Sequence, residues 1–217
     1  MKRIDKGSEP PEWTQYRCTQ GVQYESIAPL RQALYKEQGA ICAYCNRRLD
    51  DEHNCERVSS NVVEHVISRH ADPSKALDYR NMVLCCEGII HKNGGRITCC
   101  DESKGDRPIH FNPTEQHLYD TLVFQSSGKI KSTLADYQQD IDSTLNLNNK
   151  VLTDNRKSAI MGVTLHLEKK SQGRAYRKSD LRELLTKYEN RDSSGCYKEY
   201  AGVIAGYLKQ KIDKPIT

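Results

Sequence analysis

The sequence has few large apolar residues and no long apolar run. Of its 217 residues 36% are hydrophobic, only two are Phe and one is Trp, and the mean hydropathy is −0.78. No run approaches the roughly 20 apolar residues that a membrane-spanning helix needs. The charged start, Met1 to Gly7, lacks the apolar segment of a signal peptide. We therefore expect a soluble, cytoplasmic protein of one sizeable domain or two small ones, with a modest core.

A strong excess of one charge is also absent. The formal net charge is +4, and the charged residues, 29% of the chain, have both signs interspersed. Such a balance permits a nucleic-acid partner without indicating one. The exception is the stretch 156–191, which carries ten Lys or Arg against four Asp or Glu, a local net charge of +6. This stretch is either a solvated helix face or a surface for nucleic acid or a partner protein.

Nine cysteines, an odd number, do not suit a disulfide framework in a reducing cytosol. Cys42 and Cys45 have the spacing of a zinc knuckle, and each of two later doublets can supply one more thiolate. Because neighbouring residues of a strand point to opposite faces, one member of each doublet should bind metal and the other should pack. Four thiolates predict a structural zinc site with no open position. The doublets are Cys85-Cys86 and Cys99-Cys100, and the isolated cysteines, expected only to pack, are Cys18, Cys55 and Cys196.

The periodicity predicts an α+β protein with a broken middle and a mainly helical end. Residues 1–25 have no clear period and read as an arm, with Trp13 as its anchor. A helix capped by Ser26 is expected to run to Gln38 and to end at Gly39. Later strands are expected at 62–67 and 81–84, short helices at 73–79 and 101–105, a loop at 87–98, a hairpin at 123–132, and helices at 133–146, 150–170, 178–191 and 196–212.

Between the cysteine groups lies a set of residues suited to phosphodiester chemistry. Glu64 and His65 are neighbours on a predicted strand; the imidazole can take a proton from water near neutral pH, and the carboxylate is a hard ligand for Mg²⁺. Asn81 can tie down a loop or orient the histidine. Asp101 can supply a second carboxylate to the same metal, and Lys104 can meet a phosphate. These residues predict a metal-dependent phosphodiesterase centre.

The order of these motifs resembles the HNH endonucleases, which carry a ββα-metal module. The resemblance implies that His65 is the general base and that Asn81 is the middle residue of the motif. Glu64 is expected to be catalytic with them and to hold the catalytic Mg²⁺ together with Asp101. It also favours Cys86 and Cys100 as zinc ligands over Cys85 and Cys99. Asp101 stands where the family usually has a His, so His91 or Asp78 is an alternative second ligand of the catalytic metal. The matching segments are Cys42–Cys45, Glu64–Ile67, Asn81–Leu84 and Cys100–Lys104.

Over nearly the whole length the chain resembles the PtuB-like nuclease subunits of Septu and retron-associated anti-phage defence systems. The flanking matches include Met1–Gly7, Phe111-Asn112-Pro113, Ser127–Ile130 and Leu145–Asn148. The resemblance implies an effector that works with an ABC/SMC-like, PtuA-like ATPase, and with a retron reverse transcriptase and its small DNA or RNA as a further partner. It implies three regions: an arm and helix at 1–39, the nuclease module at 40–113 and a helical docking region at 114–217.

Two other functions fit parts of the pattern. One is a non-catalytic, zinc-finger-like module that binds nucleic acid or protein, which the aspartate in place of the usual histidine supports. The other is a redox switch based on the vicinal cysteines, without firmly held zinc. The main expectation is a Mg²⁺-dependent endonuclease with a structural zinc and no membrane partner.

Overall fold

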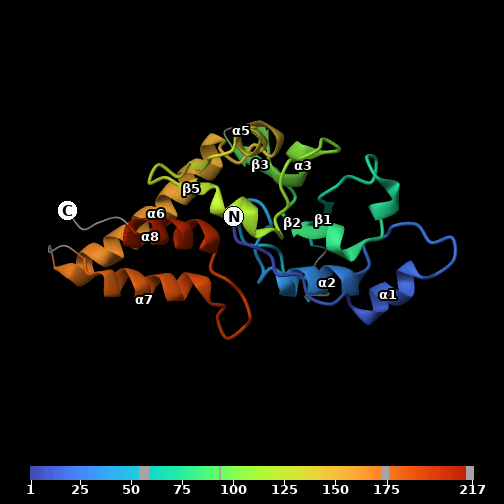
Figure 1. Cartoon of the computed structure of the whole chain (residues 1–217), viewed down its shortest axis with the longest axis horizontal. Helices are drawn as coiled ribbons and strands as arrows, with labels where there is room; N and C mark the ends of the chain where they lie inside the picture. The colour runs from blue at the N-terminus through green and yellow to red at the C-terminus, as the bar shows by residue number, and fades with distance from the viewer. Residues whose placement is uncertain (54–58, 93, 173–175, 214–217) are drawn as a thin grey trace.

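The computed structural model describes residues 1–53, 59–92, 94–172 and 176–213, and it has an α+β fold (Figure 1). The strands β1 and β2 (Val62–His65 and Met82–Cys85) lie between the middle and one end of the long axis. The helices α6, α7 and α8 (Lys150–Ser171, Lys178–Glu189 and Ala201–Asp213) lie towards the other end. Among the described helices none is both long and apolar enough to cross a bilayer.

The N-terminal arm contains a helix that the sequence did not reveal, α1 (Pro11–Arg17). Trp13 on this helix is fully buried, so it anchors the arm as expected. Helix α2 (Ala28–Glu37) lies within the expected range, but its N-cap is Ile27 and not Ser26. The hydroxyl of Ser26 instead accepts a hydrogen bond from Arg31, which explains why the capping prediction was wrong.

Strands β1 and β2 form an antiparallel pair in which Glu64 lies opposite Val83 and His65 opposite Met82. The chain between them makes two 3₁₀ turns, Pro73–Lys75 and Tyr79–Asn81. Asn81 therefore ends a turn immediately before β2 and is not the first residue of the strand. Helix α3 (Cys100–Lys104) comes later in the chain, where a short helix was expected.

The segment predicted as a loop at 87–98 is instead a second hairpin, β3 (Ile89–Lys92) with β4 (Gly95–Thr98). Its strands have only four residues each, and burial does not alternate along them, so the period of two that marks a half-buried strand is missing. The β-branched pairs Ile89–Thr98 and Ile90–Ile97 hold the hairpin together.

The C-terminal half is mainly helical, as expected. The predicted hairpin is present, but α8 begins five residues later than expected because residues 196–200 lead into it as a loop and turn. The predicted helix at 133–146 is shorter and splits into α5 and a π-helical turn at Asp140–Thr144, and α4 was not expected. The remaining bounds are α4 Gln116–Asp120, β5 Leu122–Phe124, β6 Ile130–Ser132 and α5 Ala135–Gln139.

The first residues of the chain pack into this C-terminal half. Met1 is buried so closely against α8 that a Cβ on Gly202 would lie 2.1 Å from the Met1 carbonyl oxygen. The backbone N–H of Ile4 donates to Pro113 O, and the ammonium of Lys2 donates to Glu189 O. The regions 1–39 and 114–217 are therefore joined through contacts that the first residues of the chain make.

A buried arginine on α6 fixes the C-terminal half. Arg156 is fully buried, and its guanidinium donates to Gly128 O at 2.6 Å and to Leu147 O at 2.7 Å. Gly128 has φ +84°, and a Cβ there would lie 2.0 Å from Thr153 O, so only glycine allows this approach of the hairpin turn to the helix. One side chain thus holds α6 against the β5–β6 turn and against the chain that leads into the helix.

We expect Arg156→Ala to lower the free energy of unfolding by about 3 kcal/mol, because it leaves two buried carbonyl groups without donors. Urea denaturation followed by circular dichroism measures the change. Lys157→Ala is the matched control: it removes the same charge from the next, exposed position and should leave stability nearly unchanged. Equal losses in both variants would contradict the role given to Arg156.

Candidate metal centre and the adjoining pocket

A tight turn after α2 presents the first two cysteines. The N–H of Cys42 donates to Arg47 O, and the N–H of Asn46 donates to Cys42 O. Asn46 has φ +60°, a conformation that Asn tolerates better than most residues and that closes the turn. Cys42 and Cys45 therefore place their sulfurs on one side of the turn, as a zinc knuckle requires.

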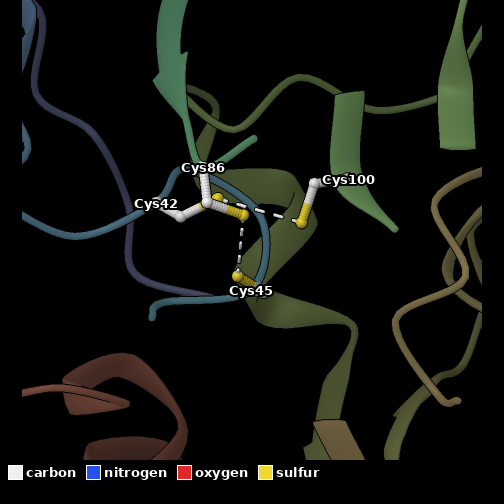
Figure 2. Close-up of side chains that lie close together, drawn as sticks. All are labelled: Cys42, Cys45, Cys86 and Cys100. Carbon is white, nitrogen blue, oxygen red and sulfur yellow. Dashed lines mark hydrogen bonds between the residues drawn. The ribbon is translucent and has the colours of Figure 1, made fainter. Parts of the chain in front are cut away.

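Four buried sulfurs converge at this turn (Figure 2). Cys42 and Cys45 come from the turn, Cys86 follows β2, and Cys100 begins α3; all four sulfurs lie within 4.8 Å of one another. The Cys42–Cys100 sulfur distance is 3.9 Å and the Cys45–Cys86 distance is 3.8 Å. A tetrahedral zinc with Zn–S bonds of about 2.3 Å requires sulfurs about 3.8 Å apart. The cluster fits a zinc ion held by four protein ligands.

The structure separates the members of the two doublets as the resemblance implied. Cys85 is the last residue of β2 and lies outside the four-sulfur cluster; burial raises the pKa of its thiol to about 12. Cys99 has an extended backbone, whereas Cys100 has φ +55° and donates its N–H to Leu145 O. This left-handed residue turns the chain into α3 and brings the second sulfur of the doublet into the cluster.

One of the three isolated cysteines differs from the expectation that it packs. Cys18 is exposed, so the expectation that it packs was wrong, because the turn after α1 lies at the surface. Cys196 is half-buried. Cys55 lies outside the described residues.

Sequence analysis missed one residue of the metal centre. Arg47 is half-buried, and its guanidinium donates to the sulfurs of Cys86 at 3.1 Å, Cys45 at 3.5 Å and Cys99 at 3.7 Å. Donors of this kind offset the negative charge of a four-thiolate zinc site and hold the sulfurs in place. The only signal in the sequence is a basic residue two positions after the knuckle.

We expect Cys86→Ser to lose metal and Cys85→Ser to keep it, because only the first removes a sulfur of the cluster. The adjacent, equally buried position makes Cys85 the matched control. Metal analysis of the purified proteins should give about one zinc per chain for the wild type and Cys85→Ser, and far less for Cys86→Ser. That variant should also unfold at a lower temperature, since zinc binding stabilises the folded state. Retention of zinc in Cys86→Ser would contradict the ligand set.

His65 lies beside this centre, on β1. Its Nε2 is 3.0 Å from Ala76 O. Because a carbonyl oxygen only accepts, Nε2 carries the proton and the lone pair of the neutral ring is on Nδ1. Burial lowers the pKa of His65 below its usual value, and the bond to Ala76 opposes that shift. The imidazole is therefore neutral at pH 7 and can accept a proton at Nδ1.

Asn81 holds the loop that supplies this partner. Its Oδ1 accepts from the N–H of Ile67 at 2.8 Å, and its Nδ2 donates to Ile67 O at 2.9 Å and to Lys75 O at 3.3 Å. The last of these carbonyls is adjacent to the one that His65 contacts. Of the two roles weighed for Asn81, the structure shows the tie to the loop, and its effect on His65 passes through residues 67–76.

Two carboxylates face each other in a pocket of about 270 Å³ that His65 also lines. Glu64 is buried, and its Oε1 accepts from the Tyr44 hydroxyl at 3.0 Å. Burial, together with a hydrogen bond to Asp101, raises the pKa of Glu64 to about 8, and Lys104 acts in the opposite direction. The lining residues are Val62, Val63, Glu64, His65, Ser68, Arg69, Asp101, Glu102, Lys104, Gly105 and Asp106.

Lys104 is not placed to meet a phosphate as the sequence suggested. Its ammonium is fully buried, 2.8 Å from Glu64 Oε1, and it donates to His65 O at 3.1 Å. Its positive charge favours the ionised form of Glu64 and so partly opposes the effect of burial on the pKa of that carboxyl group.

The alternative metal ligands lie away from this pocket. Asp78 caps the 3₁₀ turn before β2 by accepting from the Arg80 N–H, and His91 is exposed on β3. Neither lines the pocket. Asp101 remains the residue that faces Glu64.

A search of protein-family models finds none that matches the chain, and no curated protein matches it either.

Proposed function

We propose that this chain is a Mg²⁺-dependent endonuclease of the HNH type, in which β1, β2 and α3 form a ββα-metal module. The observation that carries the proposal is the grouping in one pocket of a neutral histidine, whose Nε2 is bound to Ala76 O, with two acidic side chains, Glu64 and Asp101. The raised pKa of Glu64 means that its carboxyl group holds a proton at pH 7, which a bound Mg²⁺ would displace. A general base and a pair of hard oxygen ligands are the parts that phosphodiester hydrolysis requires. The four-cysteine centre beside them is suited to bracing the module.

His65 would take the proton of a water molecule at Nδ1 while Nε2 stays bound to Ala76 O. The water oxygen then attacks phosphorus in line with the 3′ oxygen, and the bond between phosphorus and that oxygen breaks. The departing 3′ oxygen takes a proton from solvent, so the products are a 5′ phosphate and a 3′ hydroxyl. Glu64 and Asp101 would hold Mg²⁺, which, when bound, stabilises the negative charge that develops on the leaving oxygen. Asn81 keeps residues 67–76, and thereby the partner of Nε2, in place.

The wider role follows from the resemblance. As a PtuB-like subunit the chain would be the effector of an anti-phage system, acting with an ATPase partner. The helical region 114–217 would dock that partner, and the resemblance extends to a retron reverse transcriptase with its small nucleic acid.

The basic stretch 156–191 offers fewer free positive charges to a ligand than its composition suggests. Arg156 is buried, Lys170 pairs with Asp180 and Glu183, and residues 173–175 lie outside the described part of the chain.

One observation favours the second candidate, a non-catalytic module that binds nucleic acid or protein. Glu64 already has a lysine and a tyrosine as partners, Lys104 and Tyr44, and these compete with a metal ion for its oxygens. A binding module retains its affinity when Mg²⁺ is chelated, whereas an endonuclease loses turnover.

We expect His65→Ala to cut about 10²- to 10⁴-fold more slowly than the wild type, because it lacks the general base. Cleavage of plasmid DNA, single-stranded DNA and total RNA is measured in Mg²⁺ or EDTA, with and without the ATPase partner. His70→Ala, an exposed histidine outside the pocket, is the matched control and should cut normally. Undiminished cutting by His65→Ala would sink the mechanism, and wild type that binds nucleic acid but never cuts would favour the binding module.

Asp101→Asn should raise the Mg²⁺ concentration for half-maximal cleavage by at least about tenfold, since it removes one of the two carboxylates that would hold the ion. A Mg²⁺ titration of the cleavage rate measures this. Glu102→Gln is the control, because Glu102 lines the same pocket but pairs with Arg96. Both variants should retain zinc. An identical Mg²⁺ dependence in the wild type and Asp101→Asn would remove Asp101 from the metal site.

A further inference from the structure

The pocket beside His65 has two basic side chains in its wall, and only one is available to a ligand. Lys104 is buried against Glu64. Arg69 lines the same pocket and is exposed. Within the described part of the chain, no carboxylate pairs with its guanidinium and no acceptor takes a hydrogen bond from it; its recorded close contact is with an aromatic ring. A cation at the mouth of a pocket rich in carboxylates, yet without an ion pair, requires an explanation.

The ring is that of Tyr24, from the segment between α1 and α2. The Arg69 Cζ lies 4.6 Å from the centroid of the Tyr24 ring, and the His65 ring meets Tyr24 edge to face, with centroids 4.6 Å apart at 79°. One aromatic ring thus contacts both the proposed base and the free arginine. A guanidinium stacked on a ring keeps its N–H donors in its own plane, free to bind another group.

Tyr24 and the turn that carries Arg69 are each held in place by further contacts. Tyr24 packs edge-on to the fully buried Trp13, with ring centroids 6.3 Å apart, and the Tyr16 hydroxyl donates to Gln23 O. Arg69 lies in a turn that begins beside Ile67, which Asn81 holds, and the Ala71 N–H donates to the Ser68 hydroxyl. The ring that stacks on the guanidinium and the backbone that carries Arg69 are therefore both in place before any ligand arrives, which lowers the entropy cost of binding.

The planar guanidinium fits a phosphate group in particular. Its fork of donors binds two phosphate oxygens at once, with charge assistance, which a lysine ammonium does not reproduce. The acidic residues in the wall of the pocket repel a phosphate. The position of Arg69 therefore decides where a phosphate can enter. The ligand class that matches a fixed arginine beside a histidine base is the phosphodiester backbone of a nucleic-acid strand.

We propose that Arg69 is the phosphate-binding residue of this pocket and that Tyr24, from the N-terminal segment, is a positioning residue for both Arg69 and His65. The inference rests on the proposed function and deepens it. It extends the substrate site beyond residues 40–113, because Tyr24 belongs to the arm.

The first test measures binding without cleavage, in the His65→Ala background and in Mg²⁺. Fluorescence anisotropy follows labelled single-stranded DNA, duplex DNA and RNA of one sequence. Adding Arg69→Ala should weaken binding about 10- to 100-fold and reduce the slope of affinity against salt by about one phosphate contact. Arg80→Ala, which removes an exposed arginine outside both the pocket and the basic stretch 156–191, is the matched control and should change little.

The outcomes separate this inference from the proposed function. Cleavage by the wild type with an unchanged KM in Arg69→Ala overturns the role of Arg69 and leaves the nuclease standing. Binding that depends on Arg69 in a protein that never cuts supports the subsite and overturns the nuclease. Equal affinities in the Arg69→Ala and Arg80→Ala backgrounds, or no binding of any of the three nucleic acids, overturn the subsite.

The second test concerns Tyr24. Tyr24→Leu removes the ring and should both raise KM and lower kcat, since it frees Arg69 and His65 together, whereas Arg69→Ala should act mainly on KM. Tyr24→Phe keeps the ring and should restore both values to within a few-fold of the wild type. All variants should hold zinc and melt like the wild type. A Tyr24→Leu variant with wild-type kinetics, or a Tyr24→Phe variant as defective as Tyr24→Leu, would contradict the positioning role.

Discussion

The approach of four cysteine sulfurs to within 4.8 Å of one another is the constraint on which the rest of the site depends. The cluster joins three segments that lie far apart in the sequence: the turn after α2, the end of β2 and the start of α3. The strands involved have four residues each, and α3 has five, too few to be stable alone in water. A metal bound by all three segments would brace them in addition to the apolar packing of β2, where Met82, Val83 and Leu84 are fully buried.

The sequence was most informative where the chemistry depends on local spacing. The knuckle spacing of Cys42 and Cys45 and the alternation within the doublets predicted one thiol from each doublet, and the family resemblance favoured Cys86 and Cys100, the two that the structure groups with the knuckle. The adjacent pair Glu64 and His65 and the later Asp101 were likewise singled out, and they line one pocket. The catalytic role of these residues remains a prediction.

What could not be predicted depends on contacts between distant segments. The β3–β4 hairpin lacks an alternating pattern. Tyr24 and Arg47 are ordinary residues in the sequence, and they gain significance only from what the fold places against them. For Lys104 the sequence predicted too much. Its spacing after Cys100 suggested a phosphate contact, but in the fold its ammonium is buried and pairs with Glu64. Pairing inside a low-dielectric pocket competes with ligand binding, and the outcome depends on three-dimensional distances.

The cysteine-rich region is not an independent unit, because the C-terminal half holds its turns. Cys100 donates its N–H to Leu145 O, Asn46 of the knuckle accepts from the Tyr200 N–H, and the Asn146 amide donates to Thr98 O. Gly39, at the entry to the knuckle, packs so closely on the Tyr197 ring that a Cβ there would lie 2.5 Å from it. These contacts connect the start of α8 and the chain before α6 directly to the residues that position the sulfurs. If the chain is the partner-controlled nuclease proposed above, a protein docked on the C-terminal helices would act on the same backbone that positions the four sulfurs and, through α3, Asp101. Such a partner would influence the pocket without touching the substrate.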